Sequence, residues 1–271
     1  MKVWKGLFEK EWAILKWGII TLGLLSFVVV LLGPLFTSRV FNVPQDFFTN
    51  TLALVGIWLV FNILMSVGVL MTSLGHEMKR PDTWLHSPVS MLQLVGAKAV
   101  FAAGVTAFLL VLNGILLIVS FLISDAVGTI SVTDGVLSLF SVLVSIFLHS
   151  ILIMAVGFMI WSIYQVIHSR IGSLSGFVTT ILFFLGAATG LYLSDKFLIG
   201  RKIADILHAI NEFGPVKVTD TRFYDEHTSY LFSGLVPEGV IVSIGILLVG
   251  SLFTVLLFGA GSMLFEKKVR L

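Results

Sequence analysis

Long apolar stretches separated by short polar segments dominate the hydropathy pattern of the chain. Six of them hold about 20 residues or more without Asp, Glu, Lys or Arg, as a helix needs to cross a hydrocarbon core about 30 Å thick. They lie at Trp17–Phe36, Leu52–Leu74, Ala99–Ile123, Val136–Trp161, Ser173–Leu193 and Gly239–Phe265. The pattern predicts an all-α membrane protein with one transmembrane domain, residues 1–271, built as a six-helix bundle.

Composition supports a membrane protein. Hydrophobic residues make up 57% of the 271 residues and charged residues 12%, whereas a soluble domain carries about a quarter charged residues. The net charge of +2 is small, and in such a chain it bears on orientation, so no nucleic-acid partner is expected. The absence of cysteine excludes disulfides, thiolate metal sites and cysteine nucleophiles.

The distribution of Lys and Arg predicts the orientation of the spans. One side of the membrane holds both termini, the 75–98 loop and Arg170, with eleven of these residues, and the other holds Arg39 and the 194–238 loop, with six. Cytoplasmic loops carry the excess of positive charge. The count therefore predicts a multi-pass protein of the cell membrane, with both termini and the 75–98 loop in the cytoplasm and the 194–238 loop outside.

Residues 1–16 have the pattern of an amphipathic helix. Such a helix lies along the inner membrane surface, with tryptophans at headgroup depth and lysines near anionic lipid. A plain positively charged anchor with no other role has the same sequence signature. The apolar residues are Trp4, Leu7, Phe8, Trp12 and Leu15, and the polar residues on other faces are Lys2, Lys5, Glu9 and Lys16.

A second amphipathic helix is predicted outside the membrane, before the last span. Its apolar positions recur at helical spacing, and Gly214-Pro215 ends it. The helix either caps the outer mouth of a pathway or rests as a surface helix on the bundle. Its apolar face comprises Ile199, Ile203, Ile206, Leu207, Ile210 and Phe213, and its polar face Arg201, Lys202, Asp205, His208 and Glu212.

Several short segments imitate catalytic motifs but lack an essential residue. His76-Glu77 begins like a zinc-binding H-E-x-x-H, yet position 80 is arginine. Residues 172–176 resemble a nucleophile elbow, yet the central position is Leu174. A phosphate-binding G-x-x-x-x-G-K-[ST] loop is absent from the sequence. We therefore expect no enzyme activity, no metal and no bound cofactor in this chain.

Three polar residues inside the predicted spans are candidates for lining a pathway. They are Asn62, Asn113 and His149. Polar side chains at such depth mark pathways in some membrane proteins, whereas in others they form hydrogen bonds between helices. The sequence leaves both roles open for each of them.

The polar 75–98 loop contains an unusual apolar pair. Pro81 and Pro88 bracket a short segment in which Asp82 or Thr83 can cap one or two helical turns. Trp84 and Leu85 follow. An exposed Trp–Leu pair ringed by charge suits a protein interface, while a lone tryptophan also suits the aromatic belt of a membrane.

The sequence of this loop resembles that of a known family. The run Glu77…Trp84-Leu85-His86-Ser87-Pro88-Val89-Ser90…Gly96-Ala97-Lys98 is similar to the signature loop of type-2 ABC exporter permeases, the ABCG-like membrane subunits. In that family "WL-x-SP-V-S" follows the second span and a lysine opens the third helix. Lys10-Glu11-Trp12, the six spans, the external helix and the short basic tail also resemble it. Lys79–Thr83 departs from the usual turn of the family.

The resemblance implies a non-catalytic permease subunit that couples to a separate ATP-binding subunit. Mg-ATP binds to that partner, and a second permease subunit, identical or paralogous, completes the pathway in the lipid bilayer. A self-sufficient secondary transporter or channel, and a membrane-embedded enzyme, are the competing classes. The residues that the resemblance assigns to the ATPase-coupling loop are Glu77, Arg80, Trp84, Leu85, His86, Ser87 and Pro88.

The predicted topology can be tested by labelling single cysteines. The chain has no cysteine of its own, so an Asp205→Cys variant carries one thiol, in the 194–238 loop. We expect an impermeant maleimide to label it from outside intact cells, with the cysteine-free parent as control. Labelling of residue 205 from the cytoplasmic side would overturn the orientation.

Overall fold

The computed structural model describes residues 2–40, 47–78, 91–123, 132–171, 215–217 and 241–269, together with Phe177, Thr179, Ile181 and Leu185. Within these residues the chain is helical apart from two three-residue strands. Five of the helices are long and apolar enough to cross a membrane, and they match five of the six predicted stretches. The remaining stretch, Ser173–Leu193, and the predicted external helix lie outside the described residues except for the four single positions.

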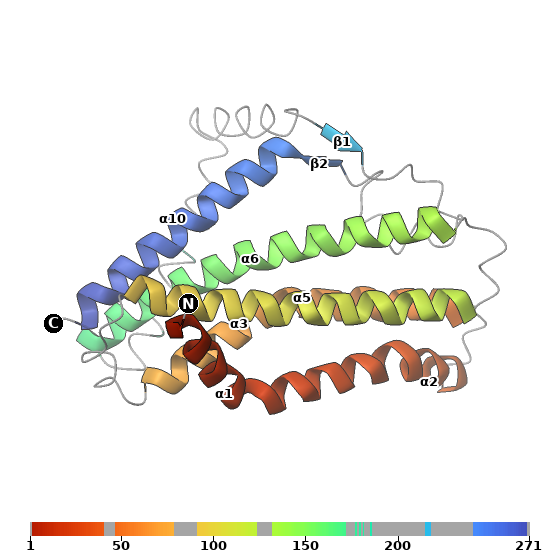
Figure 1. The fold of residues 1–271 in the computed structure, drawn as a ribbon, viewed down its shortest axis with the longest axis horizontal. Helices are drawn as coiled ribbons and strands as arrows, with labels where there is room; N and C mark the ends of the chain where they lie inside the picture. The colour runs from red at the N-terminus through yellow and green to blue at the C-terminus, as the bar shows by residue number, and fades with distance from the viewer. Residues whose placement is uncertain are drawn as a thin grey trace. The chain divides into compact units, whose positions relative to one another are not determined.

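The described elements follow one another in the order shown by Figure 1. The helices continue beyond the apolar stretches, because hydropathy sets the length of the span but not the end of the helix. Thus α3 runs to Met78 and α5 already begins at Met91. The elements are α1 (Lys2–Phe27), the π-helix η1 (Val28–Leu32), α2 (Gly33–Val40), α3 (Phe47–Met78), α5 (Met91–Ile123), α6 (Val132–Ile171), β1 (Pro215–Lys217), β2 (Ile241–Ser243) and α10 (Ile244–Val269). Strands β1 and β2 pair in a two-stranded sheet.

The helices belong to two compact units. The first contains α1, η1 and α2, the part of α3 up to Ser73, the part of α5 from Ala97 and the part of α6 up to Ile153. The second contains the end of α3, the beginning of α5, α6 from Met154 and nearly all of the last strand and α10. Helices α3 and α5 thus leave and re-enter the first unit on either side of the 75–98 loop.

The core of the first unit lies between η1, α3 and α5. Side chains of α6 pack against this core, and outward-facing positions on the same helices are large and apolar, as contact with lipid requires. Interhelical hydrogen bonds add specificity: Trp58 Nε1 donates to Ser26 Oγ (2.9 Å), and Ser66 Oγ donates to the Ser150 carbonyl (2.9 Å). The buried core residues are Val30, Val55, Leu59, Leu110, Leu116 and Leu117.

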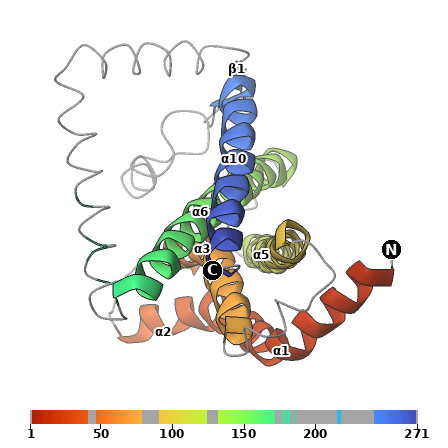
Figure 2. The ribbon, with the colours of Figure 1, turned by 90° about the vertical axis from the view of Figure 1, so that its left-hand side faces the viewer.

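The first helical run is bent near its beginning and wound differently near its end. The first turns of α1 run at a steep angle to the rest of the helix, which continues into η1 and α2 (Figures 1 and 2). At η1 the Gly33 N–H bonds to the Val28 carbonyl, five residues back. Pro34 follows and has no N–H to offer the preceding turn, which favours such a rearrangement. A Cβ on Gly33 would lie 2.8 Å from Leu54 Cδ1, so glycine permits the close approach to α3.

Aromatic rings join α6 and α10 in the second unit. Phe158 stacks on Phe258 with ring centroids 5.4 Å apart, and Trp161 contacts Phe265 at 5.0 Å. Phe158 and Phe265 are fully buried. A Cβ on Gly261 would lie 2.8 Å and 3.0 Å from two carbons of the Phe158 ring. Only glycine at this position lets the two helices pack as they do.

We therefore expect Gly261→Ala to destabilise the pairing of α6 with α10. The added methyl group overpacks the Phe158 ring, which typically costs about 1–3 kcal/mol. Gly259→Ala is the matched control, because a Cβ there meets nothing within 4 Å. Thermal unfolding of the purified protein in detergent should show a lower midpoint for Gly261→Ala and an unchanged or slightly higher one for Gly259→Ala. Equal midpoints for the two variants would contradict the packing.

Candidate functional site

An acidic residue lies on the apolar face of the first helix. Glu11 stands four residues after Leu7 and four before Leu15, so all three share one face of α1. The structure buries Glu11 to 2% exposure. A carboxylate withdrawn from water is stable only when a cation and hydrogen-bond donors compensate for the lost hydration. The position of Glu11 therefore demands a buried partner.

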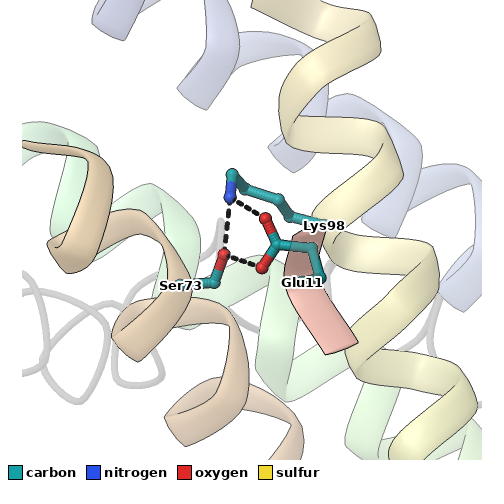
Figure 3. A network of polar contacts seen from close by, with 3 residues as sticks. All are labelled: Glu11, Ser73 and Lys98. Carbon is teal, nitrogen blue, oxygen red and sulfur yellow. Dashed lines mark hydrogen bonds and ion pairs between the residues drawn. The ribbon is translucent and has the colours of Figure 1, made fainter. Parts of the chain in front are cut away.

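That partner is Lys98, one of the first residues of α5 in the first unit. Lys98 is also 2% exposed and forms a hydrogen-bonded ion pair with Oε1 of Glu11. Its Nζ donates to Ser73 Oγ at 2.6 Å, and Ser73 Oγ donates to Oε2 of Glu11 at 2.5 Å. Figure 3 shows the three side chains converging from α1, α3 and α5. We call this closed triangle the Glu11–Ser73–Lys98 network.

The network satisfies its own charges. Both carboxylate oxygens accept a hydrogen bond, and the ammonium group donates to the carboxylate and to the hydroxyl. Hydrogen bonds between charged groups are about twice as strong as neutral ones. Removing one partner from such a pair is costly, because it leaves the other charge buried and uncompensated. The network therefore holds three segments that are 25 to 87 residues apart in sequence.

A serine beside a lysine also invites comparison with hydrolases that use a Ser–Lys dyad. In such a dyad the lysine accepts the proton of the serine. Here Lys98 donates to Ser73, and the serine hydroxyl donates to Glu11. All three side chains are buried, so no substrate reaches the hydroxyl in this conformation. The arrangement is suited to holding helices together and not to nucleophilic catalysis.

The His, Asp and Glu side chains that the structure describes do not form a metal site. Among the described residues, no cluster of three or more His, Asp or Glu side chains is placed to hold a metal ion. His76 is exposed on α3, whereas the adjacent Glu77 is buried. Consecutive helical residues point in different directions. The side chains of His76 and Glu77, the two residues of the incomplete H-E-x-x-H segment, therefore face different surroundings.

The residues predicted for the coupling loop fall mostly outside the described part. Glu77 lies on the last turn of α3, four residues after Ser73 and on the same face. It is buried and engaged in an interaction. Its position extends the buried polar face of α3 by one turn beyond the network. Arg80, Trp84, Leu85, His86, Ser87 and Pro88 lie outside the described residues.

The structure places the three pathway candidates separately. Asn62 and Asn113 are buried, at 2% and 1% exposure, and their amide groups donate to carbonyls of their own helices, those of Trp58 (2.9 Å) and Leu109 (2.8 Å). His149 is exposed, with Nδ1 2.7 Å from the Ser145 carbonyl. No hydrogen bond joins any two of the three in the described part of the chain. A polar side chain that bonds to its own helix contributes to packing. Since Asn62 and Asn113 are also buried, they expose no polar surface here.

One buried acceptor on α5 is not matched by a donor. Asn113 Oδ1 accepts no hydrogen bond from the described residues. The residue belongs to a polar row on α5, where Lys98, Thr106, Asn113 and Ser120 recur every seven or eight residues and are all buried. Thr106 and Ser120 bond back to carbonyls of the preceding turn, as Asn113 does. Lys98 differs from the other members of this row because it bonds to two other helices.

The network itself was not among the predicted site residues. Lys98 was counted with the charges of the 75–98 loop, but α5 begins at Met91 and the Lys98 ammonium is buried in an ion pair. The sequence held one signal, namely that Glu11 interrupts an otherwise apolar helical face. An acid in that position requires a buried cation, and Lys98 stands at the edge of an apolar stretch. Ser73 gives no such signal, since serine is ordinary in a span.

Comparison with protein-family models, with curated proteins and with solved structures finds no match. Evidence on function therefore comes from the sequence and from the contacts of the described residues. In the Glu11–Ser73–Lys98 network, buried charged groups from two helices meet a hydroxyl from a third.

A double-mutant cycle tests the energetic role of the ion pair. Glu11→Gln and Lys98→Met should each lower the free energy of unfolding by about 3–5 kcal/mol, because each leaves a buried charge. The double variant should cost less than the sum, since its second change removes that charge. Unfolding in mixed detergent micelles provides the measurement.

The exposed pair Lys5–Glu9 is the matched control for this cycle. Its charged atoms are 3.9 Å apart, and the side chains are 81% and 69% exposed. Such pairs contribute about 0.3–0.5 kcal/mol, so Lys5→Met should change stability little. Strict additivity of the Glu11 and Lys98 changes, or an equal effect of Lys5→Met, would show that burial does not strengthen the pair.

Proposed function

We propose that the chain is a membrane-spanning permease subunit of an ABC exporter. It forms part of a translocation pathway in the cell membrane and couples, through the 75–98 loop, to a separate subunit that binds and hydrolyses Mg-ATP. A second permease subunit, identical or paralogous, completes the pathway. In this proposal the described helices supply five spans and residues Ser173–Leu193 the sixth, with both termini in the cytoplasm.

One observation carries the proposal. The residues that resemble the permease family occur in two separate stretches, Lys10–Trp12 and Glu77–Lys98. A buried ion pair joins Glu11 of the first stretch to Lys98 of the second. The ion pair thus links one residue of each stretch, as expected if both stretches serve the same function. A chance likeness confined to a surface loop would not require a buried contact with the N-terminal helix.

The contacts also suit the mechanical task that the proposal assigns to the loop. An exporter driven by a separate ATPase needs a cytoplasmic loop whose displacement reaches the spans. Helices α3 and α5 flank the loop, and the network ties them to α1 within a few residues of their loop ends. A push on the loop would act on three helices together. This arrangement supports coupling to an outside source of force.

The competing class, a secondary transporter or channel, receives less support from the polar residues of the spans. A carrier coupled to protons or sodium uses intramembrane acids or amides that are free to bind the ion. The amide nitrogens of Asn62 and Asn113 donate to their own helices, and the buried Glu11 is engaged by Lys98, whereas Asn113 Oδ1 is not matched by a donor. The contacts of Asn62 and Glu11 favour packing and force transmission over ion binding.

We expect Trp84→Ala combined with Leu85→Ala to reduce binding of the partner ATPase. Truncating an interface tryptophan typically costs about 2 kcal/mol or more, roughly a thirtyfold weakening. The measurement is recovery of the ATPase with affinity-tagged permease purified from its native host, together with ATP hydrolysis by the recovered complex. Membrane insertion should be unchanged, because the spans are untouched.

Two controls distinguish ATPase binding by Trp84 and Leu85 from a general effect of removing apolar side chains and from an aromatic-belt role of Trp84. Trp17→Ala with Ile20→Ala removes an exposed tryptophan and an exposed aliphatic side chain from α1 and should leave ATPase recovery intact. Trp84→Phe tests the aromatic-belt role, in which an aromatic replacement is silent. If no ATPase accompanies the wild-type protein, the proposed function fails. If ATPase recovery is undiminished in the Trp84/Leu85 variant, the proposed role of these two residues fails.

A further inference from the structure

We infer that the Glu11–Ser73–Lys98 network stays closed throughout the transport cycle, so that the N-terminal segment of α1 moves as one body with the parts of α3 and α5 that it contacts. Glu11 and Lys98 are then positioning residues for coupling, and the N-terminal segment is a moving part of the exporter. This inference rests on the proposed function. The contacts that lead to it do not depend on that function.

The geometry of the contacts is that of a rigid joint. Each of the three side chains bonds to both of the others, and each comes from a different helix. A single ion pair lets two helices pivot about one contact. A closed triangle removes that freedom, because any pivot breaks at least one of the three bonds.

A second contact holds the same two helices together one turn away. The ring centroids of Phe8 and Phe101 lie 6.1 Å apart, and those of Trp4 and Phe8 lie 6.0 Å apart. Phe8 precedes Glu11 by three residues, and Phe101 follows Lys98 by three. The N-terminal segment therefore rests on α5 through an ionic and an aromatic contact at neighbouring levels. Two contacts spaced along α5 oppose tilting as well as sliding.

The energetics favour a joint that stays closed over a latch that opens. Opening would leave a carboxylate and an ammonium group apart in a region that excludes water. From the usual cost of separating a buried pair, the open form should amount to less than about one per cent of the molecules. A switch must populate both of its states. Without an entering ion or water to replace the lost contacts, this network does not populate an open state.

The joint is also close to the point at which force would enter. Ser73 is the last residue of α3 in the first unit, and α3 continues as a helix for five more residues to Met78. Lys98 follows the helical start of α5 at Met91 by seven residues. At a rise of 1.5 Å per residue, the two helix ends extend roughly 8 Å and 10 Å beyond the network. Helical extensions of only one or two turns transmit displacement with little bending.

Distances between spin labels test whether the joint holds. The cysteine-free chain accepts labels at Lys5→Cys and Val100→Cys, both exposed positions of the first unit. Val100 lies two residues from Lys98 and thus on a different face of α5. Double electron–electron resonance should give one narrow distance distribution for the permease alone. The same distribution should persist in the complex with its co-purifying ATPase, both with ADP and when trapped with ATP and vanadate.

Variants of the network provide the matching perturbations. Lys98→Met and Glu11→Gln should broaden the distribution at least twofold, and the exchange Glu11→Lys with Lys98→Glu should narrow it again. Ser73→Ala keeps the ion pair and removes the hydroxyl that bonds to both charges. For this variant we expect a distance distribution of intermediate width, and it replaces Lys98→Met if that variant cannot be purified. Glu9→Gln removes an exposed acid from the same helix and should leave the distribution unchanged.

Hydrolysis by the assembled complex separates positioning from folding. Lys98→Met should lower the maximal rate of ATP hydrolysis per complex several-fold and leave the KM for ATP unchanged, because the nucleotide site is on the partner. A purely structural role would lower the amount of complex and not the rate per complex. The charge exchange should restore the rate.

Two results would overturn the inference. A second distance that appears only in the vanadate-trapped state would show that the network opens during the cycle. An unchanged narrow distribution in Lys98→Met would show that the network does not hold the segment. If no ATPase co-purifies, the proposed function fails and the coupling role with it, while the labels on the permease alone still report whether the three helices are held together.

Discussion

A carboxylate and an ammonium group that are both withdrawn from water have to remain in contact, and the described part of this chain is arranged around one such pair. Glu11 and Lys98 come from helices that apolar packing alone would bring together only loosely. Lipid tails are as apolar as leucine, so burial of apolar side chains gives little preference for one helix neighbour over another. The ion pair supplies that preference. Ser73 then fixes the third helix by bonding to both charges.

The other contacts of the first unit follow the same logic at lower strength. Trp58 bonds to Ser26 and Ser66 bonds to the Ser150 carbonyl, so polar groups join α3 to α1 and to α6. Thr106, Asn113 and Ser120 bond to their own helix and join nothing. Helix α3 is thus the common neighbour in these interhelical bonds. It also leads into the 75–98 loop, to which the proposed function assigns the coupling.

The spans were predictable from the sequence and the network was not, for a physical reason. Hydropathy reports how long a segment stays apolar, and that sufficed to locate the five spans that the structure describes. It does not report which partner a buried charge finds, because Glu11 and Lys98 are 87 residues apart. Hydropathy also ended α3 too early and began α5 too late, since a helix can include polar side chains beyond its apolar stretch. The one readable trace of the site was an acid on an apolar face, four residues from leucine on either side.

The choice of an ion pair at this place has a further consequence for motion. Apolar helix contacts in lipid can exchange one neighbour for another at small cost, which suits surfaces that slide past each other. A buried pair of opposite charges cannot exchange, because neither lipid nor an apolar side chain replaces the lost partner. Relative motion of helices therefore meets more resistance at this pair than at apolar contacts. An ionic contact next to the loop and apolar contacts elsewhere thus differ in how readily they permit motion, and the proposed coupling to a cytoplasmic loop depends on that difference.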